Sequence, residues 1–182
     1  MTENATVQSI GKSLFAQAGE DGNVYAVLDG AAVGRDLIVN LYKRQPEFHC
    51  VFPGDLEPDM AEVAPYLVEL KPGAPFTDWV LAEGWGKHWG IFATSPAGIL
   101  QMRGHFQALV NVFDENGKPL IFRYYDPRVL RVFLPTCDSG ELAEFFGPVS
   151  VYVAETEDAE SLACFHKEAG RLRRQELRLA AT

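Results

Sequence analysis

The chain has 182 residues, 47% of them hydrophobic and 23% charged, which is the size and composition of one folded domain. Its 16 Lys and Arg against 25 Asp and Glu give a formal net charge of −9. This charge argues against sequence-independent nucleic-acid binding and against a basic membrane-binding surface. The charge is uneven, because residues 167–182 carry +3 and residues 1–166 carry −12.

Cysteine spacing and hydropathy favour a cytoplasmic protein. Cys50, Cys137 and Cys164 lie far apart, which is more typical of reduced thiols than of a disulfide framework or a zinc site. No apolar run approaches the roughly 18–20 residues that span a bilayer, and residues 1–20 lack a secretory pattern. Because no metal, nucleotide or nucleophile motif occurs, we expect no cofactor and no catalytic residue.

The first half of the chain predicts short strands alternating with helices. Residues 24–28 are an apolar run between Gly22-Asn23 and Asp29-Gly30, which predicts a buried strand. Apolar residues at helical spacing predict a helix over 34–45 that ends at Pro46. Further elements are predicted as strands over 48–52, 64–70 and 88–94 and as a helix over 76–82.

The middle of the chain predicts a hairpin between helices. Ser95-Pro96 is typical of a helix start, and that helix continues through Phe106. Asn116-Gly117 predicts a turn joining antiparallel strands. The remaining predicted elements are strands over 109–113 and 120–125, a helix from Asp126 to Leu134, and a helix from Asp138 or Ser139 to Phe146.

The C-terminal part predicts one strand and one long helix. Residues 149–153 are apolar and β-branched, and Leu162, Phe165, Ala169 and Leu172 follow helical spacing within a predicted helix over 156–179. We therefore expect a mixed α+β (α/β) domain over 1–154 with a mixed, partly antiparallel sheet flanked by helices. A C-terminal helix, 155–182, would form a partner-specific segment.

The densest polar cluster in the sequence follows the predicted hairpin. Alternation on a strand would place Arg123 and Tyr125 on one side, with Asp126 and Arg128 at the strand exit. One interpretation is an Asp-Pro turn whose carboxylate satisfies backbone donors and pairs with an arginine. The other is a recognition surface, since Arg and Tyr are enriched at protein interfaces.

Two further features permit a structural and a functional interpretation. His105 is a candidate structural residue, but a small hydrolase could combine it with Asp126 or Asp29. The cluster Trp79, Trp85 and Trp89 predicts packing or a partner-binding face.

Five blocks of residues, in order along the chain, resemble a known family. They are residues 25–31, 64–68, 104–106, 122–130 and 145–149. The chain is similar through them to domain-of-unknown-function family 4123, the adaptor-chaperones of bacterial type VI secretion effectors. It departs from the common pattern in having Phe106-Gln107 where Leu-Arg is frequent.

The resemblance implies a cytoplasmic, non-enzymatic adaptor. Its partners would be a cognate toxic effector and the VgrG spike protein, with no nucleic acid and no membrane. The expected partner-binding residues are His105, Arg123, Tyr125, Asp126, Arg128, Arg171 and Arg174. The arginines of the predicted C-terminal helix could meet an acidic partner or simply offset the helix dipole. The alternatives are the small hydrolase and a cytosolic immunity protein that blocks a toxin.

Overall fold

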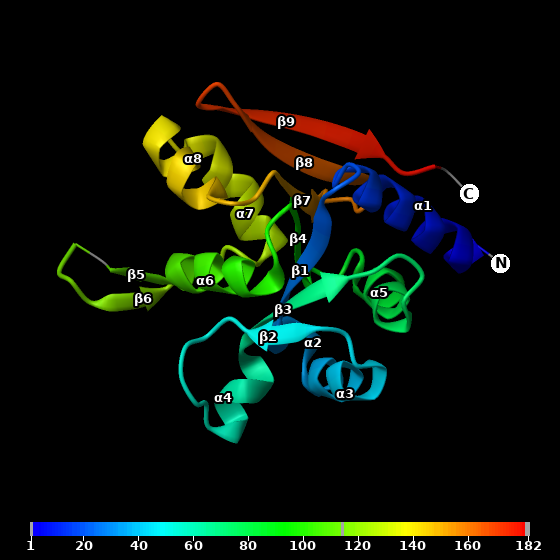
Figure 1. Ribbon diagram of the computed structural model, residues 1–182, viewed down its shortest axis with the longest axis horizontal. Coiled ribbons are helices and arrows are strands. Elements are labelled where there is room, and N and C mark those ends of the chain that lie inside the picture. The colour runs from blue at the N-terminus through cyan, green and yellow to red at the C-terminus, as the bar shows by residue number, and fades with distance from the viewer. Residues whose placement is uncertain (1, 114, 181–182) are drawn as a thin grey trace.

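Seven strands form one sheet in the order β2-β3-β1-β4-β7-β8-β9, and every paired neighbour is antiparallel. The computed structural model describes residues 2–113 and 115–180 (Figure 1). The sheet strands are β1 (Asn23–Asp29), β2 (Phe48–Cys50), β3 (Pro65–Leu70), β4 (Gly90–Ser95), β7 (Val151–Glu155), β8 (Ser161–Glu168) and β9 (Arg171–Arg178). Strands β5 (Asn111–Phe113) and β6 (Pro119–Ile121) form a separate hairpin.

Helices cover both faces of the sheet. They are α1 (Thr2–Ala16), α2 (Gly30–Val33), α3 (Arg35–Arg44), α4 (Pro58–Val63), α5 (Pro75–Trp79), α6 (Ile99–Val110), α7 (Pro127–Phe133) and α8 (Ser139–Phe146). Two further helical segments are the π-helix Val80–Gly84, which continues α5, and the 3-10 helix Leu134–Thr136, which continues α7. Figure 1 shows α6, α7 and α8 on one side of the sheet and α1 and α5 on the other. The central strands are therefore buried on both faces and read as continuous apolar runs.

The sheet consists of two parts joined at one short seam. Strand β1 pairs along its length with β3 and with β4, while β7, β8 and β9 follow one another in the chain. Among the described residues, strand pairing joins the two parts where Phe92–Thr94 of β4 pair with Val151–Val153 of β7. Buried side chains on both sides of this seam, including Phe92 and Tyr152, join the parts into one hydrophobic core. The expected mixed α+β single-domain fold is thereby confirmed, with a sheet that is antiparallel at every described pairing.

The predicted C-terminal helix is wrong, because residues 161–178 form the hairpin β8–β9. The run from Leu162 to Phe165 is buried throughout, which fits a strand covered on both faces. Ala169 and Gly170 connect the strands with φ of 49° and 74°, as in a two-residue hairpin turn with both central residues left-handed. An alanine in that conformation is uncommon, so the sequence carried no familiar turn signal.

Several other boundaries differ from the sequence prediction, among them the start of α6 and the end of β6. Ser95 ends β4 and donates its hydroxyl to the Pro148 carbonyl (2.6 Å), so α6 begins only at Ile99. Strand β6 ends at Ile121, so Arg123 and Tyr125 lie in a turn and not on a strand. That turn is held because Tyr124 is buried, stacks on Phe106 and donates its hydroxyl to the Phe106 carbonyl (3.0 Å).

The Asn-Gly hairpin and the Asp138 cap are confirmed. Asp138 accepts from the Gly140 and Glu141 amides and completes a capping box with Glu141. Within the described residues, no helix combines the length and the apolar composition needed to cross a membrane.

Candidate functional site

Two buried carboxylates end strands that run in the same direction on either side of β4. Strands β1 and β7 both pair antiparallel with β4, so they point the same way and end at the same edge. Asp29 is the last residue of β1 and Glu155 the last of β7, and both are almost fully buried. A buried charge requires partners, and each carboxylate organises a different loop.

Asp29 connects the start of a helix to the polar cluster of the sequence. Its Oδ1 accepts the Ala31 amide (3.0 Å) as the N-cap of α2. Its Oδ2 accepts from the guanidinium of Arg123, whose side chain is half exposed. The hydrogen bond to Asp29 raises the pKa of Arg123, so the guanidinium stays charged.

Asp126 forms the second half of the cluster as the N-cap of α7. Its Oδ1 accepts from the Arg128 amide (2.9 Å) and Nε (3.0 Å), and its Oδ2 accepts from Arg128 Nη2 (2.7 Å). Burial alone would raise the pKa of Asp126, but the Arg128 hydrogen bonds and charge lower it below its ordinary value. Burial and the Asp29 charge raise the pKa of the neighbouring Tyr125 to about 12, so its hydroxyl stays protonated.

The geometry of this cluster supports its structural interpretation, which is an Asp-Pro turn whose carboxylate pairs with an arginine. Asp126 caps the start of α7 and accepts two hydrogen bonds from the Arg128 side chain, as expected for an Asp-Pro turn. Arg123, Tyr125, Asp126 and Arg128 are brought together, and the sequence reasoning did not anticipate that Asp29 anchors them. Two guanidiniums still present exposed surface there, so the cluster can contact another molecule through them.

Glu155 fixes the aromatic loop over residues 84–89. Its carboxylate accepts from the amides of Gly86 (2.6 Å) and His88 (3.0 Å), and His88 Nδ1 lies 2.5 Å from Oε1. Trp85 Nε1 donates to the Ala159 carbonyl (2.8 Å) in the turn before β8. Sequence reasoning missed Glu155; its position directly after the apolar run of β7 was the available signal.

The tryptophans of this region pack mainly on their neighbours. Trp79 lies 5.1 Å from Trp89 and 5.4 Å from Phe76 between ring centroids, and Trp85 stacks on Phe92 at 6.3 Å. All three tryptophans are partly buried. The packing interpretation of the cluster thus has direct support.

His105 forms its hydrogen bonds with residues outside the arginine cluster. Its Nε2 is 3.0 Å from the Phe145 carbonyl and 3.4 Å from the Tyr152 hydroxyl, at the end of α8. A carbonyl only accepts, so Nε2 carries the proton. Burial lowers the pKa of His105, and the bond to Phe145 opposes this in part. None of the hydrogen bonds found for His105 in the described residues reaches Asp126 or Asp29, the carboxylates that a hydrolase would need beside it.

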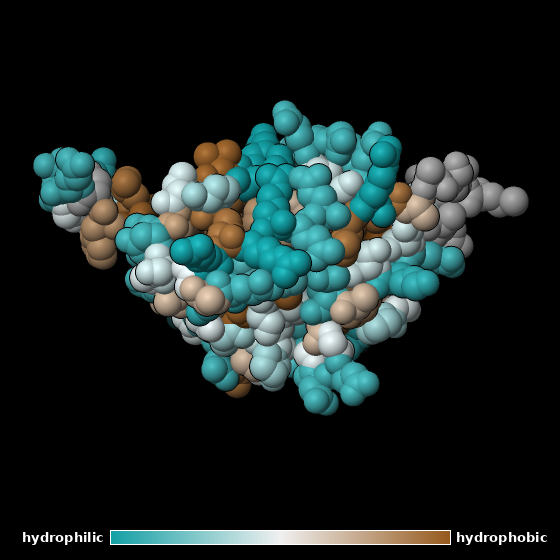
Figure 2. Space-filling view, turned by 90° about the horizontal axis from the view of Figure 1, so that it is seen from above, coloured by the Kyte–Doolittle hydropathy of each residue, from teal (hydrophilic) through white to brown (hydrophobic). Residues whose placement is uncertain are grey.

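The arginines near the C-terminus lie on β9, at the edge of the sheet. Arg174 pairs with Glu176 and lies over the Phe165 ring at 5.8 Å, and Arg173 and Arg178 pair with Glu168 and Glu160. Arg171 is exposed opposite Glu168 in the hairpin register. Figure 2 views the molecule from the side on which β9 lies and shows a largely hydrophilic surface there. Much of the positive charge here is balanced within the hairpin, contrary to a freely presented basic tail.

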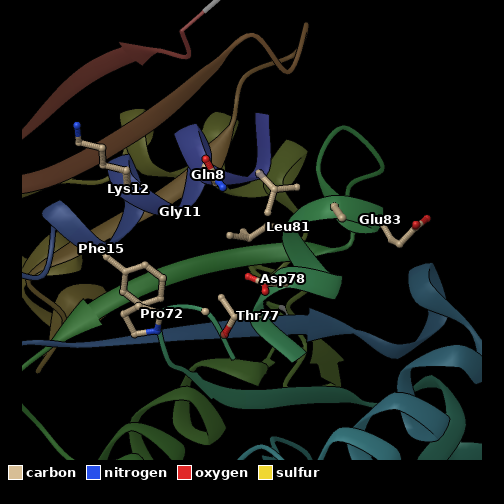
Figure 3. Close-up of a pocket in the computed structure, with 12 residues that line it drawn as sticks. Gln8, Gly11, Lys12, Phe15, Pro72, Thr77, Asp78, Leu81 and Glu83 are labelled. Atoms are coloured by element: carbon tan, nitrogen blue, oxygen red, sulfur yellow. The ribbon is translucent and has the colours of Figure 1, made fainter. Parts of the chain in front are cut away.

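A groove of about 540 Å³ separates α1 from α5 and the π-helix. Figure 3 shows Phe15 of α1 above Pro72, with Leu81 beside them and Lys12 and Glu83 pointing away. None of the site residues expected from the sequence lines it. Its charged side chains, Lys12, Asp78 and Glu83, have mixed sign and so favour no particular charge on a ligand.

Residues 24–144 match the family described as Domain of unknown function (DUF4123), and the chain belongs to this family. The match starts at β1 and ends within α8, so it includes Asp29 and the turn that holds Arg123 and Asp126. Comparison with curated proteins and with solved structures gave no match.

Proposed function

We propose that this chain is a non-enzymatic adaptor-chaperone, which binds a toxic effector in the bacterial cytoplasm and loads it onto the VgrG spike of a type VI secretion apparatus. The observation that carries the proposal is membership of the DUF4123 family over 24–144, together with the five residue blocks that resemble its adaptors.

The bonding of the polar residues supports a binding role. Asp126 is used to start α7, and Asp29 to start α2 and to hold Arg123. The guanidinium groups of Arg123 and Arg128 remain accessible to a partner. Held in place by carboxylates and able to donate further hydrogen bonds, such groups suit recognition of a polar protein surface.

The adaptor has two polar regions for its two partners in this proposal. One is the cluster of Arg123, Tyr125, Asp126 and Arg128 at the start of α7. The other is the arginine-bearing edge strand β9 with Arg171 and Arg174. The exposed pairs of β9 would contribute mainly to the rate and salt dependence of association.

The test is co-expression of the tagged chain with the effector and spike encoded beside its gene. We expect both partners to co-purify, and a strain lacking the chain to lose delivery of that effector while its apparatus still secretes. Failure of the wild-type chain to bind either partner would overturn the proposal.

A matched pair of variants examines the cluster separately. Arg128→Ala should weaken capture of one partner, whereas Arg35→Ala on α3 removes the same charge elsewhere and should not. If Arg128→Ala and Arg123→Ala fold normally and bind both partners fully, the cluster is structural only.

A further inference from the structure

The hairpin β5–β6 projects from the body of the protein and exposes apolar side chains. All six of its strand residues are exposed, and the exposed fractions are 69% for Phe113, 53% for Ile121, 45% for Leu120 and 37% for Val112. Figure 1 shows the hairpin extending beyond α6, and Figure 2 shows apolar surface on this projection. A two-stranded hairpin is marginally stable alone, and its apolar exposure is costly unless a contact covers it.

Both faces of the hairpin are apolar. The register pairs Val112 with Leu120 on one face, and Phe113 with Pro119 on the other, beside Ile121. A hairpin that packed only on its own protein would bury one of these faces. Both therefore remain available to a second polypeptide.

One face continues into a crevice at the base of the hairpin. This crevice has a volume of about 190 Å³, and Val112 forms part of its wall. Phe122, Phe133 and Phe145 supply aromatic surface, with ring centroids 4.7 Å apart for Phe122 and Phe133. The Val112–Leu120 face of the hairpin and the crevice together make one continuous apolar surface.

The charged residues that line the crevice are all acidic. Two glutamates of α8, Glu141 and Glu144, line the crevice, and no basic residue is among the described residues that do. The sequence between the two strands contains Asp114, Glu115 and Lys118, which give a formal net charge of −1. The surface thus combines apolar contacts with a negative rim.

We infer that the β5–β6 hairpin and its crevice bind a partner segment whose apolar side chains are flanked by lysine or arginine. Apolar residues of that segment would cover Val112, Leu120 and the aromatic crevice, and its basic residues would face Glu141 and Glu144. This inference takes from the proposed function only that the chain binds another polypeptide.

The first experiment uses a labelled 18-residue helical peptide with Leu and Phe on one face and Lys on the other. Controls are the same peptide with Glu for Lys, and with Ser for Leu and Phe. By fluorescence anisotropy we expect the basic peptide to bind at least about tenfold more tightly than either control. Equal affinities for the basic and acidic peptides would overturn the charge requirement.

Variants of the protein then locate the binding site. Val112→Ser and Leu120→Ser, a cross-strand pair on the face that continues into the crevice, should each weaken the basic peptide about tenfold. The control Val39→Ser removes an exposed apolar side chain from α3 and should leave binding unchanged. If the hairpin variants melt like the wild type and bind equally well, the inference is wrong.

A charge reversal tests the crevice independently of the hairpin. Glu144→Lys should weaken the peptide, whereas Glu62→Lys on α4 alters the net charge by the same amount and should not. Equal effects of the two reversals would show that only the overall charge matters, against the inference.

Light scattering and partner capture separate the remaining outcomes. A dimer of the wild type that Leu120→Ser dissociates would assign the hairpin to self-association and overturn the inference. If the wild type captures effector or spike and Leu120→Ser captures both equally, the proposed function stands and the inference fails. If the wild type captures neither but the peptide results hold, the inference stands and the adaptor proposal fails.

Discussion

Asp29, at the end of β1, holds the guanidinium of Arg123, which lies 94 residues further along the chain. The carboxylate is 2% exposed and the arginine side chain 50% exposed. The anion is therefore fixed inside the fold while the cation stays at the surface. This contact connects β1, an interior strand of the sheet, to the turn that precedes α7.

Replacing Asp29 should separate its two roles. Asp29→Asn keeps an oxygen that caps α2 but loses the charge, whereas Asp29→Ala loses both. We expect the free energy of unfolding to fall by about 1 kcal/mol for Asn and about 2 kcal/mol for Ala, measured by urea denaturation at neutral pH. Indistinguishable curves for wild type and Asp29→Ala would contradict the assigned contacts.

His105 should make stability depend on pH. Because burial lowers its pKa in the folded state, the unfolded chain, with a value near 6.5, takes up the proton first as pH falls. The free energy of unfolding should therefore decrease below about pH 6.5 and continue to do so until the folded pKa is passed. Urea titrations at pH 7.5 and 5.5 should show a larger loss for wild type than for His105→Gln. An equal loss would mean that His105 is not shielded from solvent.

Gly147 should tolerate no larger residue while His105 is present. Its φ is 47°, and a Cβ there would lie 2.6 Å from His105 Cε1. We expect Gly147→Ala to cost about 2 kcal/mol through steric overlap and backbone strain. In a double-mutant cycle, His105→Ala should recover the steric part only, giving a coupling of about 1 kcal/mol. Purely additive free energies would place the two residues further apart than described.

Glu155 should control the order of the aromatic loop. Without its carboxylate the amides of Gly86 and His88 lose their acceptors, so Glu155→Ala should destabilise the protein by about 2 kcal/mol. Hydrogen exchange should quicken over residues 84–90 more than in β3. Glu157→Ala, two residues further along the chain and exposed, is the control and should change neither the stability nor the exchange. Uniform acceleration across the sheet would indicate global destabilisation instead.

Sequence patterns correctly predicted the strands and turns that depend on residues close together in the chain. The apolar run of β1, the Asn-Gly hairpin and the Asp138 cap each depend on neighbouring residues alone. The strands β8 and β9 were mistaken for a helix because Leu162, Phe165 and Leu172 fit helical spacing. Burial on both faces comes from distant segments, which periodicity does not reveal.

In the polar cluster, too, the local contacts were predictable from the sequence and the long-range contacts were not. Asp126 and Arg128 are two residues apart, so their pairing is a local property that the Asp-Pro turn predicts. Asp29 and Glu155 acquire their roles only when the antiparallel order of β1, β4 and β7 brings their ends to one edge. No spacing in the sequence encodes that proximity.

The short seam between β4 and β7 has a consequence for synthesis on the ribosome. Strands β1, β3 and β4 all lie before residue 96 and pair with one another, so this half of the sheet can assemble before the later strands emerge. Until then β4 presents an unpaired edge where Phe92–Thr94 will meet β7. The nascent chain thus carries an unpaired strand edge until β7 is synthesised and pairs with β4.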